Sequence, residues 1–243
     1  MAEIEKPMMN EHTAKAFDGD LQELTRKVAE MGGLAEREIA DSIQALTRRD
    51  IVLAKRVVAT DPTIDALQQE IEEKAVLTIA RRQPMAIDLR EIVSALRVSN
   101  DLERIGDLAK NIAKRVAELN NEFRPQKLIR GVEHMAGLVL GQIKQVLDAY
   151  AGRDLAKALD VWRRDEEVDA MCTSLFRELL TYMMEDPRNI TFCIHLMFCA
   201  KNIERMGDHA TNIAETVHYM IEGRTITDER PKGDTTRLAA AGG

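Results

Sequence analysis

Apolar residues recur at intervals of three and four along most of this 243-residue chain, with charged residues between them. This is the period of an amphipathic α-helix, and prolines and glycines are sparse enough for the helices to be long. We expect Asp18 or Asp20 to cap the first helix and Asp88 the third, and Pro62 to start, break or kink the second. The pattern predicts an all-α chain of six long helices, over about residues 18–49, 50–82, 88–119, 127–151, 154–185 and 189–222.

One charged pattern occurs twice. Residues 102–113 read LERIGDLAKNIA and residues 203–214 read IERMGDHATNIA, with eight of twelve positions identical. Upstream, residues match at an offset of 104, as Met31 does with Met135. A core tolerates exchanges among apolar residues of similar size, so packing alone does not demand these repeated polar ones. The pattern indicates a duplicated unit with a polar function.

Each unit is about 100 residues long, which is sufficient for a three-helix bundle of antiparallel neighbours. The sequence therefore predicts two tandem three-helix bundles, at 18–120 and 125–223, joined by a linker with the sequence NNEFRPQ. Residues 1–17 would form an N-terminal extension. Residues 224–243 show no apolar periodicity, so we expect a disordered tail.

Composition and charge narrow the function classes. The net charge of −7 and pI of about 5.4 argue against a general nucleic-acid binder, which must neutralise phosphates with Lys and Arg. The three cysteines, Cys172, Cys193 and Cys199, form no CxxC pair and are expected to be buried free thiols. No stretch approaches the about 18 apolar residues of a membrane span, and the N-terminal segment lacks an apolar h-region. We expect a cytoplasmic protein, peripheral to a membrane at most.

Carboxylates at i, i+4 spacing recur in both repeats. On a helical wheel, Glu103 and Asp107 project from the side opposite the apolar stripe of their helix, and Glu204 and Asp208 do the same. Like charges at this spacing repel, and oxygen clusters suit hard divalent ions such as Mg²⁺ or Mn²⁺ and can also hold iron. The candidate metal ligands are Asp61, Asp65, Glu103, Asp107, Asp165, Asp169, Glu204 and Asp208.

A solvated acidic face remains the alternative, with the carboxylates paired to Arg104, Lys110 and Lys114. Glu215 and His218 form one Glu-x-x-His, the ligand spacing of di-iron bundles, but the first repeat has no counterpart. We expect His218 not to be a ligand. His209, whose counterpart is Leu108, is not expected to be an obligatory ligand, and His195 is expected to pack in an apolar helix.

The doubled motif and the paired elements DPTID (61–65) and DEEVD (165–169) resemble the signature of the PhoU family over about residues 13–223. The resemblance implies two three-helix bundles, a homodimer, and metal ions (Mg, Mn, Fe or Zn) on the eight carboxylates. It also implies a negative regulator of the phosphate-starvation response and of high-affinity phosphate uptake. The implied partners are the ATPase subunit of the phosphate ABC transporter and the sensor histidine kinase of the phosphate two-component system.

Two other function classes stay open. One is a di-metal carboxylate enzyme, which needs ligands converging inside a bundle and an open site for substrate. The chain has no P-loop, no Gly-rich dinucleotide fingerprint and no Gly-x-Ser-x-Gly, so we do not expect an enzyme. The other is a metal-free helical adaptor whose acidic pairs bind basic partner groups.

Overall fold

The computed structural model describes residues 9–119, 126–228 and 230, and for residues 9–16 and 126 it describes the backbone alone. The expectation of an all-α fold is confirmed. The described helices are α1 (Met9–Arg48), α2 (Ile51–Arg82), α3 (Ala86–Glu118), α4 (Gln126–Gly152), α5 (Leu155–Arg163), α6 (Asp165–Glu185) and α7 (Ile190–Glu222), with one 3₁₀ turn, η1 (Pro187–Asn189).

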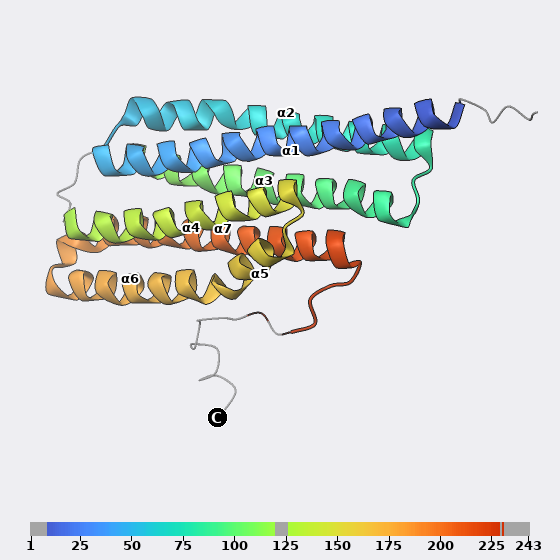
Figure 1. The fold of residues 1–243 in the computed structure, drawn as a ribbon. Coiled ribbons are helices and arrows are strands. Elements are labelled where there is room, and N and C mark those ends of the chain that lie inside the picture. The colour runs from blue at the N-terminus through green and yellow to red at the C-terminus, as the bar shows by residue number, and fades with distance from the viewer. Residues whose placement is uncertain (1–8, 120–125, 229, 231–243) are drawn as a thin grey trace, which may run out of the picture.

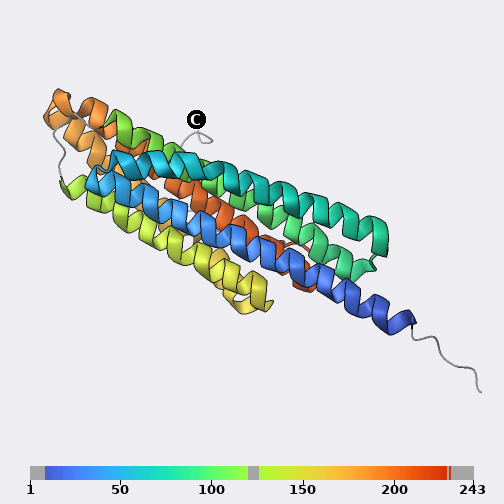
Figure 2. The same ribbon diagram turned by 90° about the horizontal axis from the view of Figure 1, so that it is seen from above.

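The helices form two antiparallel three-helix bundles that lie side by side in an elongated molecule (Figures 1 and 2). The first contains α1, α2 and α3, and the second contains α4, α5 with α6, and α7. Contacts of α3 with α7 and of α1 with α4 join the two bundles, so the apolar core is one continuous cluster. Residues 120–125, which hold most of the expected linker, lie outside the described residues.

The turn into the second helix of each bundle uses the same residues. Arg49 and Arg153 take left-handed backbone conformations, with φ of 58° and 51°. The next residues cap the helices: Asp50 accepts from the N–H of Leu53 at 2.9 Å, and Asp154 accepts from the helix it precedes at 3.1 Å. Such a cap contributes about 1 kcal/mol. The two repeats therefore share the same capping hydrogen bond at the start of their second helix.

Two expected helix starts are wrong. The first helix begins at Met9 and contains both Asp18 and Asp20, because no proline or glycine interrupts residues 9–17. The third begins after Met85, its N-cap, and Asp88 lies inside the first turn. An acid there still interacts favourably with the N-terminal end of the helix dipole.

The expected fifth helix, 154–185, is divided at Arg164 into α5 and α6. At the break the Arg164 carbonyl oxygen accepts two hydrogen bonds, one from the Glu167 N–H and one from Gln142 Nε2, both at 3.1 Å. In the first bundle the corresponding helix stays continuous although it contains Pro62. The pair α5 and α6 occupies the place of the single helix α2.

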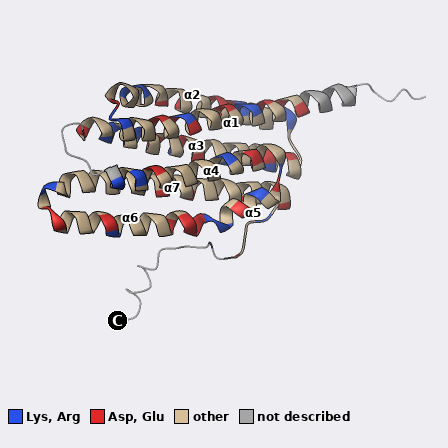
Figure 3. Cartoon of the chain, turned by 60° about the vertical axis from the view of Figure 1, so that its left-hand side comes forward, with Lys and Arg blue, Asp and Glu red and all other residues tan. Residues whose placement is uncertain are grey.

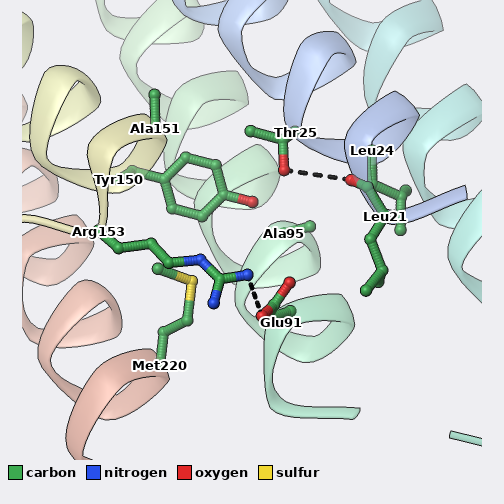
Figure 4. Close-up of a pocket in the computed structure, with 9 residues that line it drawn as sticks. All are labelled: Leu21, Leu24, Thr25, Glu91, Ala95, Tyr150, Ala151, Arg153 and Met220. Carbon is green, nitrogen blue, oxygen red and sulfur yellow. Dashed lines mark hydrogen bonds and ion pairs between the residues drawn. The ribbon is translucent and has the colours of Figure 1, made fainter. Parts of the chain in front are cut away.

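A small junction lies where α1, α3, α4 and α7 meet (Figure 4). Arg153 reaches across from the second bundle to pair with Glu91 of α3, and the buried Tyr150 packs beside them. Burial raises the pKa of the Tyr150 phenol. The cavity of about 30 Å³ has room for roughly one water molecule, so the junction is a structural contact.

Candidate functional site

The first carboxylate site consists of Asp61 and Asp65 on α2 and Glu103 and Asp107 on α3. Lys110, one helical turn after Asp107, joins the two helices. Its Nζ lies 2.6 Å from Asp61 Oδ2 and 2.5 Å from Asp107 Oδ1. The site therefore holds an internal ammonium between the helices.

The helical wheel predicted that Glu103, Asp107, Glu204 and Asp208 project away from the core, and it made no such prediction for the carboxylates of the second helix in each bundle. Asp61 and Asp165 are buried, at 5% and 3% exposed, because residues flanking the apolar stripe face the neighbouring helix of the bundle. Glu103 is 15% exposed and Asp107 is 34% exposed. The site is a partly buried seam between two helices and not an open surface.

Burial changes the proton affinities of the first site. It raises the pKa of Glu103, against the opposing effect of Arg104, and it raises the pKa of Asp65, with a further contribution from Asp61. Burial also disfavours the charged form of Lys110, but its hydrogen bonds to Asp107 and Asp61 outweigh this and raise its pKa. The ammonium is therefore the charged group that this seam favours.

The second carboxylate site consists of Asp165 and Asp169 on α6 and Glu204 and Asp208 on α7. Thr211 stands at the position of Lys110 and donates to Asp165 Oδ1 at 2.9 Å. The cation comes instead from Arg230, whose Nε lies 2.7 Å from Asp165 Oδ2.

The Arg230 guanidinium makes three further contacts. One terminal nitrogen lies 2.9 Å from Asp165 Oδ1, 2.8 Å from Asp208 Oδ1 and 3.5 Å from the Asp208 carbonyl oxygen. The side chain is 19% exposed, and Ile226 packs against the core. Residues 224–228 and 230 belong to the segment expected to be a disordered tail, and Ile226 and Arg230 are the residues of that segment that make these contacts. Residues 229 and 231–243 lie outside the described residues.

Glu204 belongs to the second site, but its basic partner is Lys201 and not Arg230. It accepts a hydrogen bond from Lys201 Nζ at 2.7 Å. Burial raises its pKa, and Lys201 opposes the rise. A groove of about 300 Å³ adjoins Glu204 and Asp169 and is also lined by Phe176 and Leu180.

Among the described side chains, no three Asp, Glu, His or Cys groups are placed so that they could together hold a metal ion. Each site brings two carboxylates together around a basic group instead. Two of the three basic groups named in the alternative of a solvated acidic face do pair with these carboxylates: Arg104 lies 3.3 Å from Glu103, and Lys110 contacts Asp61 and Asp107. A metal ion at either site would have to displace the ammonium or guanidinium.

Three residues at these sites were missed by the metal interpretation. Lys110 appeared only as a pairing group, although its i+3 spacing from Asp107 allowed a bridge. Arg230 gave no periodic signal. Glu38 on α1 is 3% exposed. Its burial could have been predicted, because this acid lies on the apolar stripe that runs through Met31 and Ala35.

Three histidines, His195, His209 and His218, have polar partners among the described residues. His218 Nδ1 lies 3.0 Å from the Arg224 carbonyl oxygen, and Glu215 accepts from Trp162 Nε1 at 3.1 Å. Glu215 and His218 thus bind protein groups, and this arrangement does not favour the di-iron alternative. His195 lies 3.4 Å from both Arg115 and Glu118 of α3, so it sits among polar groups between the bundles.

His209 also links the bundles, with Nδ1 at 2.8 Å from Asp101 Oδ1 of α3. All three cysteines are buried, as expected. Within the described residues, no helix has the length and apolar character needed to cross a membrane. Figure 3 shows acidic and basic residues interspersed along the helices of both bundles.

Comparison with known proteins places both repeats in one family. A family model described as the PhoU domain matches residues 28–116 and 132–217. A phosphate-specific transport system accessory protein PhoU homolog from Rhizobium meliloti is 58% identical over 229 residues, which is 94% of this chain and 97% of that protein. The homolog from Caulobacter vibrioides is 54% identical over 226 residues, which is 93% of this chain and 98% of that protein.

Solved structures agree with this likeness. The crystal structure of PhoU from Pseudomonas aeruginosa has a TM-score of 0.81 and 39% identity, and the match covers 86% of this chain and 100% of that chain. The phosphate transport system regulatory protein PhoU from Streptococcus pneumoniae has a TM-score of 0.80 and 27% identity, with 87% and 100% covered.

Proposed function

This chain belongs to the PhoU family, and from that premise we propose that it is a negative regulator of the phosphate-starvation response and of high-affinity phosphate uptake. The observation that carries the proposal is the family match across both repeats, with relatives named as accessory proteins of phosphate-specific transport. A role in the regulation of phosphate transport follows from the family. The direction of control and the partners are our proposal.

The proposed mode of action is contact. The protein would work in the cytoplasm as a homodimer that binds the ATPase subunit of the phosphate ABC transporter and the phosphate sensor histidine kinase. Two long helical bundles sharing one core make a rigid body, and the net charge of −7 can steer basic surfaces of partners towards it. Control then comes from bringing the transporter and the kinase together.

Deletion of the gene tests the direction of control. A promoter induced by phosphate starvation should become active in phosphate-rich medium, and a plasmid copy of the intact gene should silence it again. A promoter that stays silent in the deletion strain, with no second copy of the gene present, would refute negative regulation. A pull-down of the tagged protein from cells in high and low phosphate should recover the ATPase and the kinase, and recovery of neither would refute the contact model.

Metal binding is a separate part of the proposal. The donor sets of both sites are carboxylate oxygens, which suit Mg²⁺, Mn²⁺ or iron better than soft ions, and zinc also accepts them. One oxygen of Glu204 is buried and makes no hydrogen bond to the described residues, so the second site retains unused acceptor capacity, whereas the buried oxygen of Glu103 lies 3.3 Å from Arg104 Nε. We propose that the eight carboxylates hold metal ions after Lys110 and Arg230 move aside.

The alternative to metal binding is a metal-free adaptor. One observation favours it: Lys110 pairs with two carboxylates in the first bundle, and Arg230 pairs with two in the second. Elemental analysis of the purified protein before and after dialysis against EDTA separates the two. Stoichiometric metal that EDTA removes, with a loss of thermal stability, supports the metal sites. Protein that carries no metal and takes up none from added Mg²⁺, Mn²⁺, Fe²⁺ or Zn²⁺ supports the adaptor.

A further inference from the structure

An apolar groove of about 410 Å³ lies between the start of α2 and the end of α3. Its apolar lining consists of small side chains only: Ala54, Val58, Ala113 and Ala117. A water molecule takes up about 30 Å³ of liquid volume, so the groove has room for a large side chain.

The second bundle shows what fills the same place in the other repeat. Trp162 of α5 stands at the position of Val58, at the offset of 104 residues that relates the repeats. Trp162 is 7% exposed, and its Nε1 donates to Glu215 Oε1 of α7 at 3.1 Å. The indole ring therefore closes, between α5 and α7, the space that the smaller Val58 leaves open between α2 and α3.

The charged residues of the groove also differ from those of the second bundle. Lys114 stands at the position of Glu215, and Lys55 lines the same groove. Neither lysine pairs with an acidic group of the described residues. The one acidic lining residue, Glu118, lies 3.7 Å from Arg115 and 3.4 Å from His195, so its charge is shared with other groups. The rim of the groove is therefore suited to an acidic ligand.

We propose that this groove docks a segment of a partner protein that presents an aromatic side chain next to an acidic residue. The ring packs against Ala54, Val58 and Ala113, and the acidic residue pairs with the two lysines. Aromatic residues seated in pockets are common anchors of protein interfaces. The inference rests on the contact mode proposed above and gives it a surface and a partner chemistry.

NMR spectroscopy of the methyl-labelled, full-length protein tests the groove directly. The probe is the capped pentapeptide Ala-Glu-Trp-Glu-Ala, and two control peptides replace Trp by Ala or both Glu by Lys. We expect the probe to shift the methyl resonances of Val58 and Ala113 saturably, and each control peptide to bind at least fivefold more weakly. No saturable shift at these methyl groups, or equal affinity for the Lys peptide, would overturn the proposed chemistry.

The chain has an aromatic residue next to an acid of its own, Glu122 with Phe123, which lie outside the described residues. The variant Phe123→Ala removes this competitor, and we expect it to bind the probe within twofold of wild type. Binding that becomes at least tenfold tighter in Phe123→Ala would assign the groove to this segment and overturn the docking of a partner.

Filling the groove tests its role in cells. Val58→Trp with Lys114→Glu gives the first bundle the same pair as Trp162 and Glu215 in the second. The matched control is Val76→Trp, the same exchange at a 63% exposed position about 27 Å further along α2. With helicity and protein level matched, we expect the groove variant to lose probe binding and to leave the starvation promoter active in phosphate-rich medium, while the control silences it.

The outcomes separate the groove from the proposed function. Full silencing by a groove variant that no longer binds the probe would overturn the docking role and leave the regulator standing. A wild-type gene that does not silence the promoter would refute the proposed function, and the inference with it. If the added indole prevents folding, Lys55→Glu with Lys114→Glu takes its place, because it reverses the charge of the rim without adding bulk, and the same results are expected.

Discussion

Replacing Arg230 by Gln removes the cation of the second carboxylate site. A hydrogen bond to a charged group contributes about 1.5–3 kcal/mol, and Arg230 makes three such bonds within 3 Å. Two effects reduce the sum. Asp208 is 41% exposed, so water screens its share, and ordering the chain segment costs about 1–2 kcal/mol per residue. We expect Arg230→Gln to lower the free energy of unfolding by about 1–2 kcal/mol, which for a chain of this size is about 3–6 °C in Tm.

The matched control is Arg224→Gln, because Arg224 is also in the tail but is 77% exposed and pairs with Glu222 at 3.6 Å. Its effect should stay within about 0.5 kcal/mol. Urea unfolding of Arg230→Gln, Asp165→Asn and the double variant gives the coupling free energy, which we expect to be about 1–2 kcal/mol. Purely additive losses, with a coupling below about 0.3 kcal/mol, would refute the contact between the tail and the second site.

Three further predictions concern charge, packing and the interface between the bundles. Burial, with a contribution from Asp61, raises the pKa of Glu38 from 4.5 to about 8, so between these pH values the folded state keeps a proton that the unfolded state loses. In EDTA the free energy of unfolding should therefore fall as pH rises from 5 to 8, by at most about 1.4 kcal/mol per pH unit, and Glu38→Gln should remove this slope in urea titrations. Gly207→Ala should raise the free energy of unfolding in urea by up to about 1 kcal/mol, because alanine favours a helix over glycine and the new Cβ meets Val168 at an ordinary contact distance of 3.4 Å. Gly106→Ala should gain less or lose stability, because its Cβ comes within 2.9 Å of Ile64. Equal effects of the two variants would contradict the packing described. Separately expressed fragments 9–119 and 126–230 should each show helical circular dichroism but melt below the full chain, since both lose the contacts of α3 with α7; two unfolded fragments would show that the bundles are not independent.

The helices and the duplication could be predicted because they depend on local signals. Apolar periodicity fixed the stripes, and the repeated Asp50 and Asp154 marked two helix starts that the structure confirms. The break at Arg164 had no such signal, since no proline or glycine stands there. The Arg164 carbonyl oxygen accepts from Gln142 Nε2, which is 22 residues away in the chain, and the local sequence cannot show such a tertiary contact.

In the candidate sites, too, local spacing could be read from the sequence but tertiary contacts could not. The i, i+4 spacing paired carboxylates within each helix, but a helical wheel cannot say which flank of a stripe a third helix will cover. Asp61 and Asp165, which flank the apolar stripes, are buried. Arg230 lies 22 residues beyond Asp208 in a segment without periodicity, and only the path of the chain past Ile226 brings it to the site.

The most direct test of the account is whether the carboxylate sites are needed for regulation. In the deletion strain, a copy carrying Glu103→Gln, Asp107→Asn, Glu204→Gln and Asp208→Asn keeps the buried Asp61 and Asp165 as partners for Lys110 and Arg230, so its fold should survive. With its level and helicity matched to wild type, we expect this copy to leave the starvation promoter active in phosphate-rich medium, while a copy carrying Glu36→Gln on α1, whose charged neighbours are Lys144 and Asp148, silences it. Full silencing by the four-site variant would contradict this expectation and show that regulation does not need these four carboxylates.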